Sequence, residues 1–126
     1  MTVQERQKTV IDFCQAWDNL DVEAVLGYMS EDAVYHNMPM EPLVGQEQIR
    51  GFLGAASFCR FQILTTVADD QRVVTERLDS FTLGDNTLSE LPVLGIFEFN
   101  AEGKINNWRE YFDLKTWVDK GGPAIA

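Results

Sequence analysis

Histidine and cysteine are scarce in this sequence, which has one histidine and two cysteines among 126 residues. A single histidine argues against a histidine-based metal site or a catalytic triad. Cys14 and Cys59 belong to no C-x-x-C pair and to no Cys/His cluster. We therefore expect two reduced, buried thiols rather than a disulfide, and no metal.

Positive charge is also scarce, with 10 Lys and Arg against 20 Asp and Glu, which gives a net charge of −10. Such a surface repels phosphate groups, so we expect neither nucleic acid nor an anionic membrane as a partner. The sequence contains no P-loop and no G-x-G-x-x-G, and nothing in it indicates a nucleotide cofactor.

Long apolar runs are missing as well, because none approaches the roughly 18–20 residues that span a bilayer. The first ten residues, MTVQERQKTV, lack the basic region and apolar stretch of a secretory signal. Together with the two thiols, this predicts a cytoplasmic protein.

The chain length fits one domain, residues 1–126, with a loose tail over 119–126. Apolar residues recur with helical spacing early in the chain and alternate from residue 58 onward. The expected helices cover 10–17, 22–26 and 46–56, and the expected strands cover 33–37, 58–67, 71–83, 87–100 and 104–117. Helices followed by a mostly antiparallel run of strands define an α+β domain, and strands this long curl readily into a cone over the helices.

The stretch TERLDSF, residues 75–81, carries Arg77 and Asp79 two positions apart on an expected strand. Side chains at i and i+2 share one face of a strand, so the two charges point the same way. They form either an ordinary charge pair on the outer face or part of a site turned inward. The pattern of this strand alone leaves both interpretations open.

The stretch WREYFDL, residues 108–114, adds a third charged group. Trp108, Glu110 and Phe112 share its more apolar face, which is the better candidate for the interior. A buried carboxylate without a partner costs several kcal/mol or takes up a proton. An inward Arg77 between Asp79 and Glu110 would solve this problem.

Residues 91–98 are apolar on both strand faces for several positions. An antiparallel strand in a monomer usually keeps one wet face. We therefore expect the outer sheet face to pack against a second copy of the chain, as a homodimer.

Four stretches together resemble the limonene-1,2-epoxide hydrolase family, within the wider superfamily of nuclear transport factor 2 and ketosteroid isomerase. They are YHNMPMEP (35–42), TERLDSF (75–81), LGIFEF (94–99) and WREYFDL (108–114). The resemblance implies a curved mixed sheet, mostly antiparallel, with three to four helices in its concave side around a deep pocket. It also implies a homodimer built on the outer sheet face.

The resemblance further implies a one-step hydrolysis of a small or medium apolar epoxide, without a cofactor. A carboxylate–arginine–carboxylate group would act with a tyrosine and an asparagine that hold the attacking water. By position, Arg77 matches the arginine, Asp79 the acid, and Glu110 the general base, where the family usually has aspartate. Tyr35 and Asn37 match the pair that holds the water.

Apolar residues on the inner faces, with one from the loop after residue 37, are the expected pocket wall: Met38, Phe81, Leu91, Val93, Trp108 and Phe112. Two other functions remain open at this point. One is an epoxide-opening cyclase or isomerase, in which an internal hydroxyl replaces water. The other is a non-enzymatic protein that binds a small ligand in the same fold.

Overall fold

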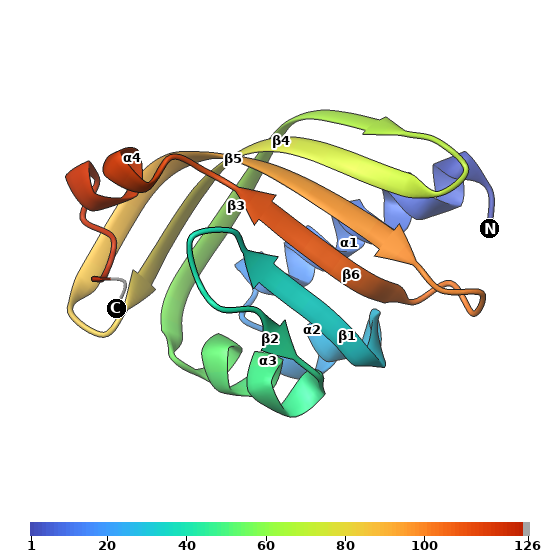
Figure 1. Ribbon diagram of the computed structural model, residues 1–126, viewed down its shortest axis with the longest axis horizontal. Coiled ribbons are helices and arrows are strands. Elements are labelled where there is room, and N and C mark those ends of the chain that lie inside the picture. Colours follow the sequence, from blue (N-terminus) through green and yellow to red (C-terminus); the bar gives the residue numbers. More distant parts are fainter. Residues whose placement is uncertain (125–126) are drawn as a thin grey trace.

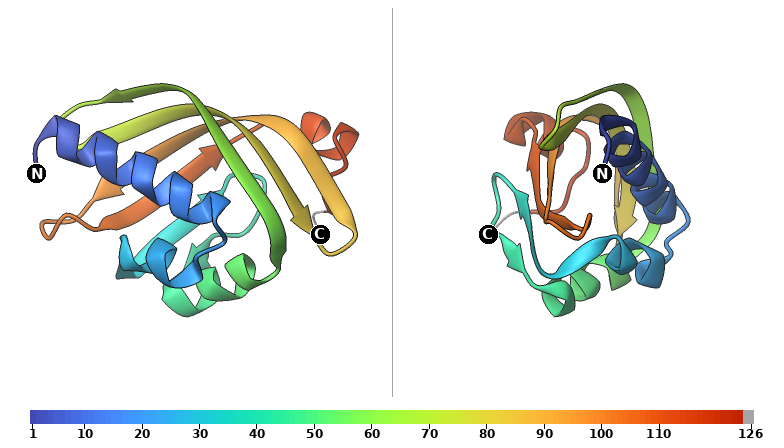
Figure 2. Two further views of the ribbon diagram at one scale, coloured as in Figure 1. Left: turned by 180° about the vertical axis from the view of Figure 1, so that it is seen from behind. Right: turned by 90° about the vertical axis from the view of Figure 1, so that its right-hand side faces the viewer.

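The computed structural model describes residues 1–124, and in them a curved sheet wraps around the long first helix (Figures 1 and 2). The helices are α1 (Val3–Asp18), α2 (Val22–Gly27), α3 (Gln46–Gly54) and α4 (Leu114–Asp119). The strands are β1 (Met29–Asn37), β2 (Leu43–Val44), β3 (Ala56–Ala68), β4 (Arg72–Leu83), β5 (Asn86–Phe99) and β6 (Ile105–Tyr111).

The sheet is six-stranded in the order β2-β1-β6-β5-β4-β3. The pair β1 and β6 is parallel, and the other neighbours are antiparallel. The sheet curls without closing, and α1 lies along its concave side (Figure 2). The expected fold, an α+β cone with a mixed, mostly antiparallel sheet, is therefore confirmed.

The first helix begins earlier than its apolar pattern predicts. Thr2 and Glu5 form a capping box, in which the Thr2 hydroxyl accepts from the Glu5 N–H and the Glu5 carboxylate accepts from the Thr2 N–H. The turns before Val10 carry mostly exposed and half-buried residues, so the buried face starts only there. The second helix begins at its expected cap, since the Asp21 side chain accepts from the Ala24 N–H.

The last strand is shorter than predicted, and the prediction that it runs to residue 117 is wrong. It ends at Tyr111, and the following residues form α4. The Asp113 side chain caps this helix by accepting from the backbone N–H and the hydroxyl of Thr116. A cap with two hydrogen bonds starts the helix despite the apolar, strand-like composition of the segment.

The apolar interior consists of two groups of side chains. The larger group joins α1 to the inner sheet face, where Phe13 packs edge-on against Phe97 and Trp108, with ring centroids 5.9 and 5.0 Å away. The smaller group lies at the α4 end, around Leu91 and Trp117. Within the described residues, no helix is long and apolar enough to cross a membrane.

Candidate active site

Alternation along the strands turns an arginine and two carboxyl groups into the interior. On β4, Thr75, Arg77 and Asp79 are buried while their neighbours are more exposed, and Glu110 is buried on β6. Arg77 is 0% exposed, Asp79 5% and Glu110 2%. Of the two interpretations left open by the sequence, the inward one describes this molecule, and the surface charge pair does not.

The Arg77 guanidinium joins the two carboxyl groups. Its Nε donates to Asp79 Oδ1 at 3.0 Å and its Nη2 to Asp79 Oδ2 at 2.8 Å, which is a bidentate contact. The same Nη2 donates to Glu110 Oε1 at 2.5 Å. Its Nη1 donates to the Thr75 hydroxyl at 2.7 Å. The central carbon of the guanidinium, Cζ, lies 4.7 Å from the centroid of the Phe61 ring.

The strand register aligns four positions across the sheet. Thr75 on β4 pairs with Gly95 on β5, Gly95 pairs with Glu110 on β6, and Glu110 pairs with Asn37 on β1. The neighbouring position on β1 and β6 is the pair Tyr35 and Trp108. Residues far apart in sequence are thus placed side by side by the register alone.

Tyr35 and Asn37 share one face of β1, two residues apart. The Tyr35 ring stacks on Trp108 with centroids 3.9 Å apart and planes 7° apart, which fixes its orientation. Its hydroxyl donates to Asn37 Oδ1 over a long 3.5 Å. Burial raises the pKa of Tyr35 well above its usual value, so the phenol keeps its proton and remains a donor.

Burial also raises the pKa of both carboxyl groups. It raises the pKa of Glu110 to about 8 against the opposing charge of Arg77, and the charge on Asp79 adds to the rise. The pKa of Asp79 is raised in the same direction, with Arg77 opposing through its charge and hydrogen bonds. The nearby Trp108 indole N–H favours the charged form of Glu110, although the two groups lack hydrogen-bond geometry.

These shifts make the cluster a neutral unit. Arg77 stays charged and holds Asp79 with two hydrogen bonds, whereas Glu110 receives one and its Oε2 is without a partner in residues 1–124. Burial and the mutual repulsion of the two carboxyl groups favour one shared proton, and the closer contact of Arg77 with Asp79 favours Glu110 as its carrier. One acid and one carboxylate in a dry place are suited to general acid–base chemistry.

An apolar cavity opens onto this pair. With its open mouth it spans about 520 Å³ of space not filled by protein atoms, of which about 40 Å³ is accessible to the centre of a water molecule. Tyr35, Asn37, Asp79 and Glu110 are its polar lining, and the Arg77 side chain lies behind them. Its other lining residues are apolar: Trp17, Met40, Phe52, Ala56, Cys59, Phe61, Phe81, Leu83, Leu91, Val93, Phe112 and Trp117.

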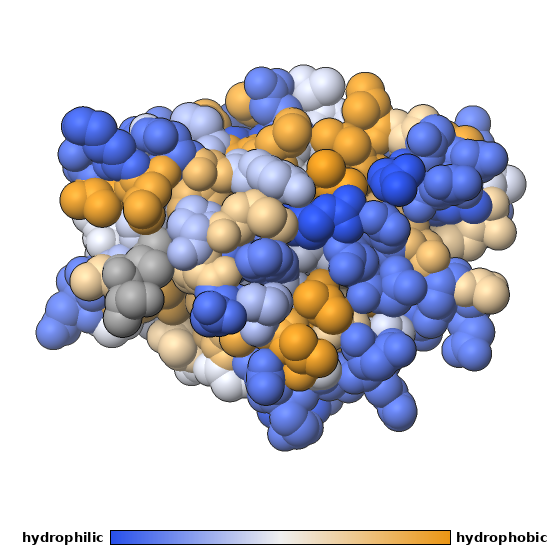
Figure 3. Space-filling view, viewed as in Figure 1, coloured by the Kyte–Doolittle hydropathy of each residue, from blue (hydrophilic) through white to orange (hydrophobic). Residues whose placement is uncertain are grey.

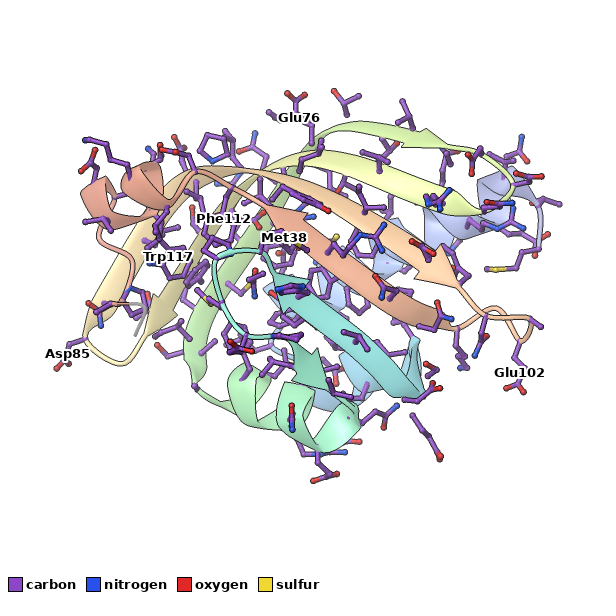
Figure 4. The ribbon with its side chains drawn as sticks, viewed as in Figure 1. Met38, Glu76, Asp85, Glu102, Phe112 and Trp117 are labelled. Atoms are coloured by element: carbon purple, nitrogen blue, oxygen red, sulfur yellow. The ribbon has the colours of Figure 1, made fainter. Side chains whose placement is uncertain are left out.

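Four of the six expected wall residues line this cavity, namely Phe81, Leu91, Val93 and Phe112. The other two are placed elsewhere. Trp108 is fully buried beneath Tyr35 rather than in the wall. Met38 lies on the turn after β1 (Figure 4), where its N–H donates to the Glu110 carbonyl. Met40 takes its place in the wall.

Sequence reasoning missed three residues of the site. Thr75 and Gly95 follow the same alternation as Arg77, so strand parity contained a signal for both. The predicted strand over residues 104–117 includes Trp117. In the structure Trp117 lies on α4, where it stacks on Phe112 with ring centroids 5.2 Å apart and lines the cavity (Figure 4).

The turn after α4 holds Trp117 in place. Its indole N–H donates to the Pro123 carbonyl at 2.7 Å, and the Gly122 N–H donates to the Trp117 carbonyl at 2.8 Å. A Cβ at Gly122 would lie 2.5 Å from the indole ring. Residues 122 and 123 of the expected tail thus contact Trp117, while residues 125 and 126 lie outside the described part.

Cys59 also lines the cavity, and both thiols are free and buried, as the sequence predicts. Burial raises the pKa of Cys59 far enough to keep the thiol protonated, so it is a wall group and a poor nucleophile. Among residues 1–124, no group of three or more His, Cys, Asp or Glu side chains is arranged to hold a metal ion.

The fold is a cone-shaped α+β domain, and a guanidinium-bridged pair of carboxyl groups at its apolar cavity is an arrangement suited to acid–base chemistry on a small molecule. The model of the limonene-1,2-epoxide hydrolase catalytic domain matches residues 4–121. The chain belongs to this family.

Solved structures agree with this membership. An LEH-like epoxide hydrolase of M. tuberculosis is 28% identical, with a TM-score of 0.83 over 94% of this chain and 90% of that one. Two more distant structures share the fold alone. Bal32a from a soil-derived mobile gene cassette is 20% identical, with a TM-score of 0.80 over 94% of this chain and 98% of its own.

The other distant structure is a hypothetical protein from Catenulispora acidiphila with a ketosteroid isomerase-like fold, solved with trimethylamine. It is 16% identical, with a TM-score of 0.76 over 91% of this chain and 93% of its own.

Proposed function

We propose that this protein is an epoxide hydrolase that adds water to a small or medium apolar epoxide and yields a vicinal diol. The observation that carries the proposal is the Arg77 bridge between Asp79 and Glu110 at the polar end of an apolar cavity. Family membership and the likeness to an LEH-like epoxide hydrolase support the same reaction.

In the proposed reaction, Glu110 is the general base and Asp79 the general acid. The oxygen of a water held by Tyr35 and Asn37 attacks an epoxide carbon, and Glu110 takes one of its protons. The bond from that carbon to the epoxide oxygen breaks, and Asp79 gives its proton to the oxygen. The carboxyl groups together keep the same number of protons, and no covalent enzyme ester forms.

This division of roles needs the proton on Asp79 before the reaction and leaves it on Glu110 afterwards. In the structure Glu110 is the favoured proton carrier, because Arg77 holds Asp79 more closely. We infer that the bound water and epoxide oxygen favour the opposite distribution, by hydrogen bonding to the carboxylate of Glu110 and the acid of Asp79. Proton return from Glu110 to Asp79 then completes each turnover.

Hydrolysis of limonene oxide and cyclohexene oxide by wild type, Asp79→Asn and Glu110→Gln tests the proposal. We expect both variants to lose at least ~10²-fold in kcat, since each removes a proton-transfer group. Glu102→Gln and Asp85→Asn are matched controls, because both residues are exposed on turns away from the cavity (Figure 4). Undiminished turnover in both site variants would overturn the assigned roles.

Labelled water separates hydrolysis from the other reactions of this fold. In ¹⁸O water a hydrolase places one solvent oxygen in the diol, whereas a cyclase or isomerase places none in its product. Binding of epoxides without any turnover by the wild type would indicate a binding protein instead.

We further propose a homodimer through the outer sheet face. In the single chain, Pro92 and Leu94 of β5 and Tyr111 of β6 are exposed there, and Leu94 pairs with Tyr111 across the two strands. Apolar groups lie over the upper strands and over α4, interspersed with hydrophilic ones (Figure 3). Burial of such a face in an interface would remove its apolar area from water.

Light scattering after size-exclusion chromatography tests the dimer. Leu94→Glu should halve the measured mass, because it places a charge at the centre of the interface. Val118→Glu is the matched control, since Val118 is 61% exposed on α4. A monomeric wild type would contradict the dimer.

A further inference from the structure

Gly95 occupies the centre of the row of residues that carries the site. It pairs with Thr75 on one side and with Glu110 on the other, in the middle of the buried face of β5. Glycine weakens a strand, and in a strand interior it often marks a close approach of other groups. Gly95 is not among the residues with positive φ, so its backbone conformation does not require glycine.

The space next to Gly95 is filled by the polar atoms of the site. A Cβ at this position would lie 2.4 Å from Arg77 Nη1, 2.8 Å from Glu110 Oε2 and 3.0 Å from Thr75 Oγ1. Nonbonded heavy atoms with a carbon partner prefer about 3.5–4.0 Å. The guanidinium and the carboxyl group therefore occupy the volume that a side chain at position 95 would take.

The guanidinium cannot leave this place without breaking contacts. Its Nη1 donates to Thr75, its Nε and Nη2 donate to Asp79, and the Phe61 ring lies on it. With Nη1 bonded to Thr75, Nη2 is the nitrogen that reaches both Asp79 and Glu110. The Thr75 hydroxyl thus sets the orientation of the planar Arg77 guanidinium.

We propose that Gly95 and Thr75 are positioning residues: Gly95 leaves the recess in which the Arg77 guanidinium meets the Glu110 carboxyl, and Thr75 orients the guanidinium within it. This inference rests on the proposed function only in that it makes Glu110 one of the two proton-transfer groups. Neither residue lines the cavity, so neither is expected to touch the substrate.

The substitution Gly95→Ala tests the recess. Its methyl group displaces Nη1 and lengthens the contact between Nη2 and Glu110, so that a still-buried carboxylate loses its nearest positive charge. We expect kcat to fall by ~10²-fold with KM nearly unchanged, because a misplacement of about 1 Å costs this much in rate. Gly51→Ala is the matched control, since a Cβ at Gly51 meets no atom within 4 Å.

The decisive measurement needs no substrate. The ¹³C signal of the Glu110 carboxyl group, assigned by its absence in Glu110→Gln, is titrated in protein labelled at glutamate. In Gly95→Ala the pKa of Glu110 should rise above its wild-type value, because Arg77 opposes the effect of burial. Gly51→Ala should titrate like wild type. An unchanged Glu110 titration in folded Gly95→Ala would overturn the inference.

Thr75 provides a second test if Gly95→Ala does not fold. Thr75→Val keeps the shape but removes the acceptor of Nη1, whereas Thr75→Ser keeps the hydroxyl. The Glu110 titration should shift upward in the valine variant and return to the wild-type value in the serine variant. Identical titrations in both variants would overturn the role of Thr75.

The titration tests the positioning roles, and the hydrolysis assay tests the proposed function, so either proposal can be rejected without the other. Shifted titrations in a protein that hydrolyses no epoxide would leave the positioning roles standing and reject the proposed function. An active wild type, together with a Gly95→Ala variant whose Glu110 titration and kcat are unaltered, would support the proposed function and reject the positioning role of Gly95.

Discussion

Asp79 and Glu110 accept hydrogen bonds from the same nitrogen, Nη2 of Arg77, at 2.8 and 2.5 Å. They share it unequally, because Asp79 receives a second bond from Nε and Glu110 does not. This asymmetry favours the charged form of Asp79 and the protonated form of Glu110. Four measurable consequences depend on it and on the cavity beside it.

The pH dependence of kcat/KM should be bell-shaped. Catalysis needs a pair with one proton, whichever carboxyl carries it, so activity rises as the doubly protonated pair loses its first proton. It falls again as the last proton leaves, near the pKa of about 8 of Glu110. The profile is measured with cyclohexene oxide in buffers of constant ionic strength. A rate that climbs steadily beyond pH 9 would contradict this prediction.

The stability of the protein should fall as pH rises toward 8. The pKa of Glu110 is raised from 4.5 to about 8 on folding, so between these values the folded state holds a proton that the unfolded state has lost. The stabilising proton is fully present below the lower value and lost above the upper one.

Glu110→Gln should remove this dependence. Relative to wild type, its free energy of unfolding should increase by up to about 1.4 kcal/mol per pH unit between the two pKa values. Urea unfolding at several pH values measures both proteins, with Glu102→Gln as the control. Parallel curves for wild type and Glu110→Gln would show that Glu110 titrates normally.

Removal of the Arg77 charge should destabilise the fold. Arg77→Met leaves two buried carboxyl groups without their cation, and breaking a buried ion pair costs about 3–5 kcal/mol. The cost should shrink below pH 4, where the two carboxyl groups are neutral in the unfolded chain as well as in the folded variant. Urea unfolding at pH 7 measures it, and Arg60→Met on the exposed face of β3 should change stability by less than about 0.5 kcal/mol. Equal effects of the two substitutions would argue against the buried cluster.

A smaller side chain at position 117 should widen the substrate range. Trp117 closes the α4 end of the cavity against Phe81 and Phe112, so Trp117→Leu opens space there. The ratio of kcat/KM for limonene oxide over cyclohexene oxide should rise. Val118→Ala, at the exposed neighbouring position, should leave the ratio unchanged. A constant ratio in Trp117→Leu would place the bulkier substrate elsewhere in the cavity.

The sequence by itself determined the fold class and the family. Alternation in β3 to β6 and helical spacing before residue 55 follow from side-chain periodicity, which is local and readable. Helix ends depend on caps. The apolar, strand-like pattern of residues 104–117 predicts a strand through Trp117, whereas the Asp113 side chain caps a helix there and so places Trp117 on α4.

Tertiary structure alone decided which face of β4 is inside and how the charged groups meet. A strand pattern with charges on one face and mixed residues on the other is compatible with either orientation, and only the curling of the sheet around α1 selects one (Figure 2). The meeting of Arg77 with Glu110 depends on cross-strand register and on the space above Gly95, neither of which is a local property. Register and packing arise between segments distant in sequence. The sequence therefore predicts Asp79 and Glu110 as partners of Arg77, but only the folded chain places the three groups in contact.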